Sequence, residues 1–277
     1  MESSAIAALR CSVCAAGVTL DGRTLRCARG HAFDLAKQGY VNLLHARVPA
    51  GTADTTEMVA ARAEFLAAGH YAPLADAIAD AVPSGDGLVV DAGAGTGYYL
   101  AAVLDRAPGA TGLALDVSAV ALRRAAKAHP AITAAVWNLW EPWPVADDSA
   151  AVLLNVFAPR NGAEFARVLR PGGTLVVASP GPGHLAELAD LGLLGIGAGK
   201  EQRLDESLSE WFVAADRRQV RLPLTLDPGA VRAVVRMGPA GHHLHRDGRA
   251  ERLAAVSSAV EVTAEFTVSV YTAKEKP

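Results

Sequence analysis

Every cysteine of the chain falls in one N-terminal stretch, "CSVCAAGVTLDGRTLRCARGH", which spans residues 11–31. Three cysteines and one histidine there follow the spacing C-x2-C-x12-C-x3-H, at Cys11, Cys14, Cys27 and His31. Two close ligand pairs joined by a short loop are typical of a tetrahedral zinc site, in which each pair lies on a turn. Because protein side chains fill all four positions, the pattern predicts one structural Zn2+ whose role is in folding.

A redox pair is the alternative for the first two cysteines. A redox C-x-x-C motif normally lies at the start of a helix that follows a strand, and it leaves Cys27 and His31 without a role. A disulfide is disfavoured in a reducing cytoplasm, where we expect the protein, and three thiols cannot all pair with one another. We therefore expect the segment to fold around zinc.

A glycine-rich stretch, "LVVDAGAGTG" at residues 88–97, is the second group of residues that could bind a ligand or do chemistry. An apolar run leads to Asp91, the glycines Gly93, Gly95 and Gly97 follow, and a helix-like segment comes next. This order predicts a strand, a tight turn and a helix whose free backbone N–H groups face a ligand. A second apolar run ends at Asp116, where an acid is placed to bind ribose hydroxyls.

Two cofactor classes use such an arrangement. Nicotinamide dinucleotides usually require G-x-G-x-x-G, whereas G-x-G-x-G behind a leading acid is typical of proteins that bind S-adenosylmethionine. The spacing here favours S-adenosylmethionine as the cofactor. A glycine-rich turn without a ligand is the alternative, and the two acids argue against it. The predicted cofactor contacts from this pattern are Asp91, Gly93, Gly95, Gly97 and Asp116.

Short apolar runs alternate with amphipathic segments through the middle of the chain. The runs predict strands at 132–138, 150–157 and 174–180. The other segments predict helices at 98–107, 118–129 and 163–173, the last of which ends at a Pro-Gly-Gly turn. This alternation indicates an α/β fold with a doubly wound, mostly parallel sheet. Two late runs, at 220–226 and 262–273, predict further strands, the second of them antiparallel.

The polar residues at the ends of the predicted strands are expected to share one crevice, because ligands bind at the carboxyl ends of such strands. Asn138 follows the third strand, and its amide oxygen can accept a hydrogen bond from a ligand. The crevice is thus expected to be lined by Asp91, Asp116, Asn138, Asn155 and the segment after Ser179.

Charge is distributed unevenly along the 277 residues. Residues 1–50 carry six Lys or Arg and three acids, whereas the remainder carries 20 basic and 26 acidic residues, so a basic module precedes an acidic body. This suits an anionic ligand at the N-terminal end, although an ordinary solvated surface would have the same composition. We find no apolar run typical of a signal peptide or a membrane span, so we expect a cytoplasmic protein without membrane association.

Several stretches together resemble the RlmA family of large-subunit ribosomal RNA guanine-N1 methyltransferases, and in particular its Gram-positive branch. They are the cysteine cluster followed by "FDLAKQGYVNLL" (33–44), "EMVAARAEFLAAGHYAPL" (57–74), "VVDAGAGTGYYL" (89–100), "LALDVSAVALRRAAKAHP" (113–130), "NVFAPRN" (155–161) and "PGPGHLAEL" (180–188). The resemblance implies a Rossmann-like class I S-adenosylmethionine-dependent methyltransferase fold with a small N-terminal zinc-binding domain. It also implies methylation of N1 of one guanine in hairpin 35 of 23S ribosomal RNA, macrolide (tylosin, mycinamicin) resistance in antibiotic producers, and a homodimer.

The resemblance carries further site residues onto this chain. It implies zinc ligands at the four positions already named, and cofactor contacts at Tyr71, the Gly95–Thr96 turn and His184. For RNA binding we expect phosphate contacts from the basic residues Arg23, Arg26, Arg29, Lys37 and Arg160. The sequence pattern identifies no side chain that would accept the guanine N1 proton, so no catalytic residue is assigned.

The expected organisation has three parts. Residues 1–45 form the zinc-binding RNA-recognition module, 46–84 a connecting helical segment, and 85–277 the methyltransferase domain. Two other functions remain open at this point: a small-molecule methyltransferase of antibiotic biosynthesis, and a non-catalytic zinc-containing RNA-binding protein. Cofactor binding distinguishes the last from both enzymes, and methyl transfer to RNA distinguishes the two enzymes.

Overall fold

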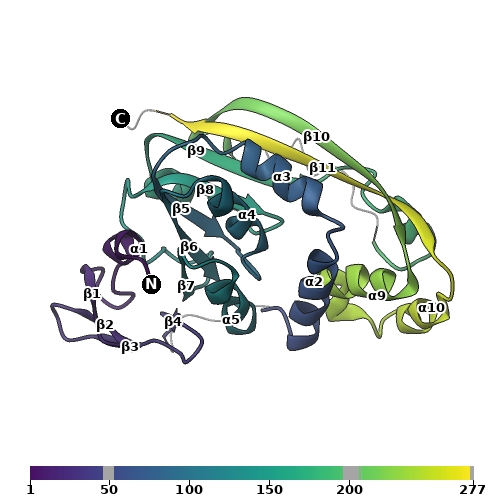
Figure 1. The fold of residues 1–277 in the computed structure, drawn as a ribbon, viewed down its shortest axis with the longest axis horizontal. Helices are drawn as coiled ribbons and strands as arrows, with labels where there is room; N and C mark the ends of the chain where they lie inside the picture. Colours follow the sequence, from purple (N-terminus) through teal and green to yellow (C-terminus); the bar gives the residue numbers. More distant parts are fainter. Residues whose placement is uncertain (46–52, 196–205, 207, 275–277) are drawn as a thin grey trace.

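One mixed sheet of eight strands organises the molecule (Figure 1). The computed structural model describes residues 1–45, 53–195, 206 and 208–274. The strand order is β10-β11-β9-β8-β5-β6-β7-β4. The strands are β4 (Tyr40–Asn42), β5 (Gly87–Ala92), β6 (Ala110–Asp116), β7 (Ile132–Val136), β8 (Ala150–Val156), β9 (Leu169–Pro180), β10 (Phe212–Leu226) and β11 (Val260–Ala273).

Six neighbouring strands of this sheet, from β9 to β4, run parallel, whereas β11 is antiparallel to both β9 and β10. After the short edge strand β4, the chain forms β5, moves outward through β6 to β7 beside β4, and then crosses to β8 on the other side of β5. The order therefore reverses between β5 and β8, and the crevice at their carboxyl ends is where ligands bind in such sheets. The predicted doubly wound α/β fold is confirmed.

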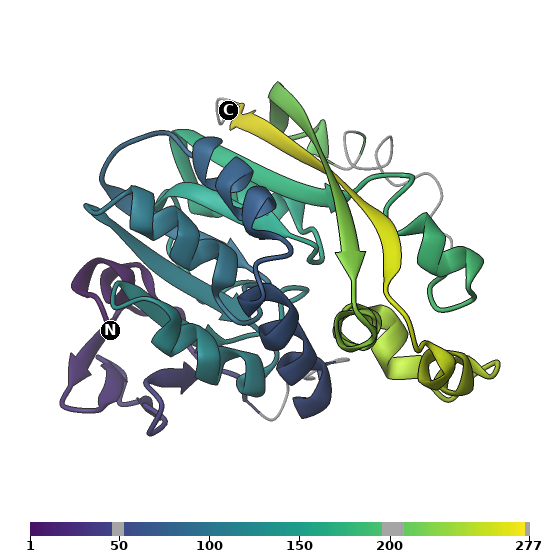
Figure 2. The same cartoon turned by 45° about the vertical axis from the view of Figure 1, so that its right-hand side comes forward.

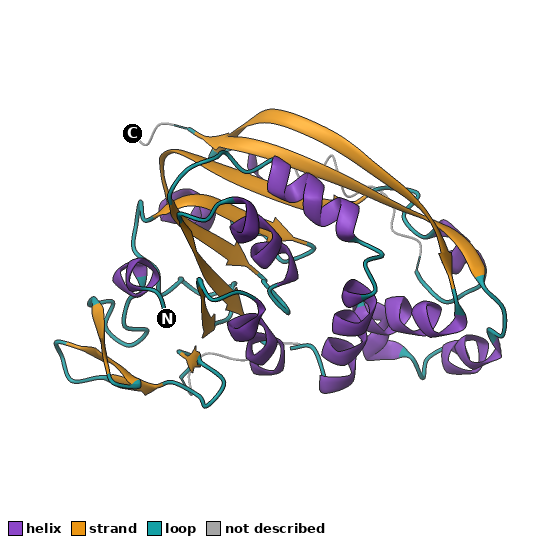
Figure 3. Ribbon diagram, in the orientation of Figure 1, coloured by secondary structure: helices purple, strands orange, loops and turns teal. Residues whose placement is uncertain are grey.

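Helices cover both faces of the sheet, so the molecule has three layers (Figures 1 and 3). One face packs against α2 (Thr56–Ala67), α3 (Ala72–Asp80), α4 (Tyr98–Arg106), α5 (Ala119–Ala128), α7 (Ala186–Asp190) and α9 (Pro228–Met237). The other packs against α1 (Ser3–Ala8) and α6 (Gly162–Val168). Between β10 and β11 the chain also forms η1 (Pro239–His243) and α10 (Arg249–Ala255) beside α9 (Figure 2).

Side-chain caps fix the starts of several helices. Thr55, Ser118, Asn161 and Asp227 accept hydrogen bonds from the backbone N–H groups at the starts of α2, α5, α6 and α9. These bonds satisfy donors that have no partner inside the helix. The predicted helices at 98–107 and 118–129 are confirmed to within a residue or two as α4 and α5.

The predicted helix at 163–173 is wrong at its C-terminal end. Helix α6 stops at Val168, and β9 begins at Leu169. Proline disfavours the helical conformation of the residue before it and has no N–H to donate, so Pro171 ends the helix. The "LRPGG" segment is instead the first part of the strand.

The N-terminal residues form a separate three-stranded antiparallel sheet of β1 (Val18–Asp21), β2 (Thr24–Cys27) and β3 (Ala32–Asp34). Strand β4 lies within the predicted 1–45 module, but it pairs in parallel with β7 and so extends the large sheet. The residues that follow, 46–52, lie outside the described part, and the three domain limits stay predictions. No helix among the described residues is long and apolar enough to cross a membrane.

Candidate functional site

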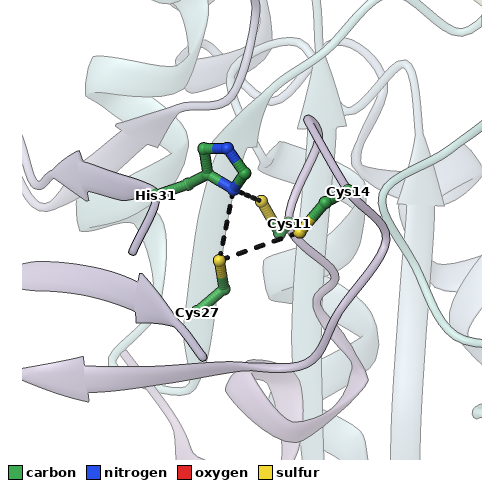
Figure 4. A group of neighbouring side chains, drawn as sticks. All are labelled: Cys11, Cys14, Cys27 and His31. Carbon is green, nitrogen blue, oxygen red and sulfur yellow. Dashed lines mark hydrogen bonds between the residues drawn. The ribbon is translucent and has the colours of Figure 1, made fainter. Parts of the chain in front are cut away.

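The four predicted zinc ligands converge in the N-terminal module (Figure 4). Their ligand atoms all lie within 4.8 Å of one another. Cys11 and Cys14 come from the turn after α1, Cys27 ends β2, and His31 precedes β3. Among the described residues this is the only group of three or more such side chains that satisfies this proximity.

The spacing of the ligand atoms fits a tetrahedral zinc ion. Nδ1 of His31 lies 3.5 Å from Sγ of Cys11 and 3.4 Å from Sγ of Cys27, and Sγ of Cys14 lies 3.8 Å from Sγ of Cys27. Zinc–sulfur bonds of about 2.3 Å and zinc–nitrogen bonds of about 2.0 Å give tetrahedral edges of about 3.8 Å between sulfurs and about 3.5 Å between sulfur and nitrogen. The four side chains therefore have the donor set and the dimensions of a closed structural site.

The backbone around the cluster prepares one thiol for metal binding. Burial acts to raise the pKa of Cys27, but hydrogen bonds from the N–H groups of Arg29 and His31 and from the His31 ring outweigh it and lower the pKa to about 6. Burial raises the pKa of Cys11. Since zinc binds the thiolate, Cys27 ionises for metal binding more readily than Cys11.

The predicted RNA-binding residues of this module differ in their surroundings. Arg23 donates hydrogen bonds to the carbonyl oxygens of Leu35 and Ala36, and Arg26 forms an exposed ion pair with Asp21 at 3.3 Å. Arg29 and Lys37 are exposed. Phosphate contacts from all four residues stay predictions. Phosphate contacts from Arg23 and Arg26 would compete with the hydrogen bonds and the ion pair that these two side chains form inside the module.

The glycine-rich turn lies at the carboxyl end of β5, where the strand order reverses. Gly93, Gly95 and Gly97 all have positive φ, at 89°, 52° and 77°, a region that side-chain-bearing residues rarely adopt. A Cβ on Gly93 would lie 2.3 Å from Cβ of Ala158, and one on Gly97 would lie 2.9 Å from Cα of Ala125. Two of these glycines are thus required by packing as well as by backbone conformation.

Asp116 fastens this turn to the end of β6. Its Oδ2 accepts a hydrogen bond from the N–H of Gly95 at 2.8 Å, and its Oδ1 accepts one from the N–H of Ser118 at 2.8 Å. Burial raises the pKa of Asp116, and these two N–H groups act to lower it. Each carboxylate oxygen keeps a second lone pair, so binding of ribose hydroxyls by Asp116 is compatible with the geometry and stays a prediction.

Asp91 is the most perturbed carboxyl group of the crevice. It is the penultimate residue of β5, only 2% of its surface is exposed, and its Oδ1 is buried with no hydrogen-bond partner. Burial, with a smaller contribution from the charge of Asp116, raises the pKa of Asp91 to about 8. A buried acid without a partner is the kind of orphaned group that a cationic or hydrogen-bonding ligand would satisfy.

We expect the affinity for S-adenosylmethionine to rise with pH. The cofactor carries a net positive charge, so its binding favours the ionised form of Asp91 and lowers the pKa of that carboxyl group. The dissociation constant for the cofactor therefore falls by up to about tenfold per pH unit as the pH rises toward 8, and it levels off above pH 8. Isothermal titration between pH 6 and 9 measures this slope and the proton release. An Asp91→Asn variant should bind more weakly and without the slope; an unchanged slope in that variant would assign the titration to another group.

Tyr71 and His184 meet across a cluster of aromatic rings. The rings of Tyr71 and His184 pack on Phe266 with centroids at 4.9 and 4.7 Å, and the hydroxyl of Tyr71 is buried without a partner. Nδ1 of His184 donates to the carbonyl oxygen of Glu265 at 3.0 Å, since a carbonyl can only accept. Burial lowers the pKa of His184 to about 4, so the imidazole is neutral at pH 7 and its Nε2 is an acceptor.

Three other predicted residues have structural contacts of their own. Asn138 follows β7, and its Oδ1 accepts the N–H of Trp140 at 3.1 Å. Asn155 is 1% exposed and donates to the carbonyl oxygens of Ala92 and Pro159, so it holds the loop after β8 against β5. Arg160 is half-buried, its Nε is buried without a partner, and burial lowers its pKa.

An ion pair between Arg62 and Asp54 lies beside the turn and was not anticipated from the sequence. Nη1 of Arg62 would be 3.3 Å from a Cβ on Gly95, and Nη2 donates to the carbonyl oxygen of Met237 in α9. The carbonyl oxygen of Asp54 accepts from Ser118 at 3.2 Å. No sequence spacing signals this pair, because tertiary packing of α2 brings it to the turn.

Two family models match the chain. The model described as "RlmA, N-terminal", a zinc ribbon, matches residues 9–48, and a methyltransferase domain model matches residues 89–173. The fold and the site therefore define a class I S-adenosylmethionine-dependent methyltransferase with a zinc ribbon at its N-terminus. The four cysteine and histidine ligands fit a zinc ion. The glycine turn at 93–97, with Asp91 before it and Asp116 beside it, fits S-adenosylmethionine.

Full-length relatives narrow the class to a family. The chain is 48% identical over 276 residues to the 23S rRNA (guanine(748)-N(1))-methyltransferase of Streptomyces fradiae, covering 98% of each protein. It is 51% identical to a relative from Micromonospora griseorubida named for guanine-N1 methylation of 23S rRNA, covering 95% of this chain and 96% of the relative. The chain belongs to the RlmA family of 23S rRNA (guanine-N1)-methyltransferases.

A solved structure agrees with the fold. A chain from a Haloferax volcanii complex of a methyltransferase and its activator superposes with a TM-score of 0.53 at 20% identity, covering 81% of this chain and 100% of that chain. At that identity the likeness concerns the fold alone.

Proposed function

We propose that this protein transfers a methyl group from S-adenosylmethionine to N1 of a guanine in hairpin 35 of 23S ribosomal RNA. The observation that carries the proposal is the near full-length identity of 48% to the Streptomyces fradiae enzyme that is named for N1 methylation of a guanine of 23S rRNA. The site supports it, because a zinc ribbon and a cofactor turn occur in one chain. A small-molecule enzyme would have no use for the ribbon.

The geometry at the carboxyl ends of β5 and β8 supports the proposed cofactor contacts. Asp116 is proposed to bind the ribose, and Asp91 and Tyr71 to face the cofactor with their unpartnered polar atoms. Gly93, Gly95, Thr96 and Gly97 are proposed to allow close approach of the backbone, Asn138 is proposed to contact the adenine end, and His184 presents Nε2 as an acceptor. S-adenosylmethionine supplies the methyl group, and zinc supplies folding energy to the ribbon.

The reaction forms a bond from guanine N1 to the methyl carbon, breaks the bond from that carbon to sulfur, and releases the N1 proton. Positioning of the base in line with the methyl group supplies much of the rate in such a transfer. The segment 155–161 beside the glycine turn has no Asp or Glu, so the chain offers no carboxylate base there. The target base must leave its stack, as in other enzymes that modify bases.

Three further features are part of the proposal. The basic ribbon residues and Arg160 are proposed to hold RNA phosphates, a homodimer is proposed from the family resemblance, and a cytoplasmic location follows from a ribosomal RNA substrate. Macrolide resistance is the proposed biological role, which a lower susceptibility to tylosin of bacteria expressing the gene would support.

The first test is methyl transfer from labelled S-adenosylmethionine to 23S RNA that lacks the modification, with the product mapped by primer extension. The expected result is a single reverse-transcription stop at one guanine of hairpin 35, because a methyl group on N1 blocks base pairing. Transfer to another base would contradict the proposed target. Cofactor binding without any transfer to RNA would favour the small-molecule alternative.

A further inference from the structure

The loop that follows β8 holds one aromatic residue, Phe157, in a left-handed backbone conformation with an exposed side chain. Phe157 has φ of 55°, in the left-handed region that a bulky side chain avoids. The residue is 45% exposed, although phenylalanine is ordinarily buried in a domain of this size. Strained residues persist only where the surrounding structure determines them, and they gather at functional sites.

The contacts around Phe157 show what determines its conformation. Its N–H donates to the carbonyl oxygen of Ala178 in β9 at 3.1 Å. Two residues earlier, the Asn155 amide donates to Ala92 at 3.2 Å and to Pro159 at 3.0 Å, which closes the loop on itself. The next residue, Ala158, occupies the space that a Cβ on Gly93 would need. The loop is thus clamped between β5, β9 and the glycine turn.

The ring of Phe157 lies at the open end of the aromatic cluster beside the cofactor turn. Its centroid is 5.5 Å from Phe266 and 6.1 Å from Tyr99. On the inner side, Phe266 packs against Tyr71 and His184, both predicted to contact the cofactor. The inner rings are more buried, so Phe157 is the member of this cluster with the largest free face.

Two other aromatic residues near strand ends, Trp140 and Trp143, are less well placed to stack on a substrate base. Trp143 is 4% exposed and belongs to the core on the opposite face of the sheet. Trp140 is 66% exposed, but it follows β7, which β6 separates from β5. Phe157 follows β8, directly beside β5 at the point where the strand order reverses.

We infer that the exposed face of Phe157 is the stacking platform for the target guanine, and that the left-handed loop conformation holds the ring against the cofactor turn. An extruded base needs an apolar surface to replace its lost stacking, and aromatic rings supply it. The inference rests on the proposed function, since it names the residue that positions the base in that reaction.

The test compares Phe157→Leu and Phe157→Trp with the wild type on a hairpin RNA substrate. Leucine keeps an apolar side chain but has no aromatic face, so kcat/KM is expected to fall by about 10- to 100-fold. Tryptophan should restore kcat/KM to within about threefold. The dissociation constant for S-adenosylmethionine and the melting temperature should stay near wild type in both variants. Val213→Ala, a truncation at a 56% exposed position of β10, is the matched control.

A cross-linking experiment separates stacking from support of the loop. A hairpin RNA with 6-thioguanine at the target position is irradiated with the wild type, and the cross-linked peptide is identified by mass spectrometry. The expected peptide contains residue 157, and the Phe157→Leu variant should lose this cross-link while still binding RNA.

Several outcomes would overturn the inference. They are a Phe157→Leu variant with kcat/KM within about threefold of wild type, a loss of cofactor affinity that matches the loss of kcat/KM, or a cross-link to a different residue. If the wild type itself transfers no methyl group to RNA, the proposed function fails and the stacking role fails with it. If the wild type is active and Phe157→Leu is equally active, only the stacking role fails.

Discussion

Replacing Cys27 with alanine is expected to abolish zinc binding and to lower methyl transfer to 23S RNA by at least about 100-fold. Structural zinc contributes on the order of 10 kcal/mol or more to the folding of small zinc modules. Cys27 is 8% exposed, ends β2 and has two of the close ligand contacts, to Cys14 and His31. Its loss leaves three ligands and a solvent-sized vacancy in the coordination shell.

The ribbon cannot compensate for this loss with a core of its own. Its strands are only four, four and three residues long, and small modules of that size depend on a metal or a disulfide for stability. Its buried residues Val18 and Leu25 pack in the same cluster as Leu88 and Leu113 of the large sheet. Unfolding of the ribbon should therefore uncover part of one sheet face and lower the melting temperature, whereas the cofactor turn on β5 stays intact.

Three measurements check this prediction: zinc per chain by mass spectrometry, S-adenosylmethionine affinity by titration, and methyl transfer to RNA. Ser12→Ala is the matched control, because Ser12 lies between two ligands and its hydroxyl has no hydrogen-bond partner. That variant should keep one zinc ion and full activity. A zinc-free Cys27→Ala protein that methylates RNA at the normal rate would show that the ribbon needs no metal.

Local patterns explain why so much of the architecture could be predicted. The zinc ligands lie within 21 residues of one another, and the cofactor turn is a continuous segment, so spacing alone brings their groups together. The alternation of apolar runs with amphipathic segments likewise determines the order of strands and helices. In each case the sequence pattern and the structure that it predicts lie in the same short segment of the chain.

Contacts between distant segments explain what the sequence did not predict. Arg62 reaches the carbonyl oxygen of Met237 across 175 residues, and His184 reaches that of Glu265 across 81. The conformation of Phe157 depends on Ala178 in a neighbouring strand. Such contacts arise when the sheet assembles, and no spacing within the chain encodes them. The short strand β4 was missed because three residues are too few to show a period.

Replacing Gly93 with alanine is expected to lower both stability and cofactor binding, through two separable causes. The φ of 89° strains any residue with a Cβ, at a cost of about 1–2 kcal/mol. The new methyl group would also lie 2.3 Å from Cβ of Ala158, and relief of that overlap costs roughly another 1–3 kcal/mol.

Methyl transfer should fall together with the stability. The overlap has to push the glycine turn away from the loop of Ala158, and displacement of a positioning group by about 1 Å can cost on the order of 100-fold in rate. We therefore expect the unfolding free energy to fall by about 2–5 kcal/mol and methyl transfer to fall by about 100-fold. Urea unfolding and a methyl-transfer assay measure the two quantities.

Two further variants separate the causes of this loss. Gly172→Ala shares a positive φ, 72°, but has nothing within 4 Å of the added Cβ, so it should lose about 1–2 kcal/mol and keep full activity. In the double variant Gly93→Ala/Ala158→Gly the colliding methyl group is absent, so much of the activity should return while the φ strain remains. If the double variant is no more active than Gly93→Ala, close approach of the loop is not what the turn requires, and the backbone conformation of Gly93 alone explains its presence.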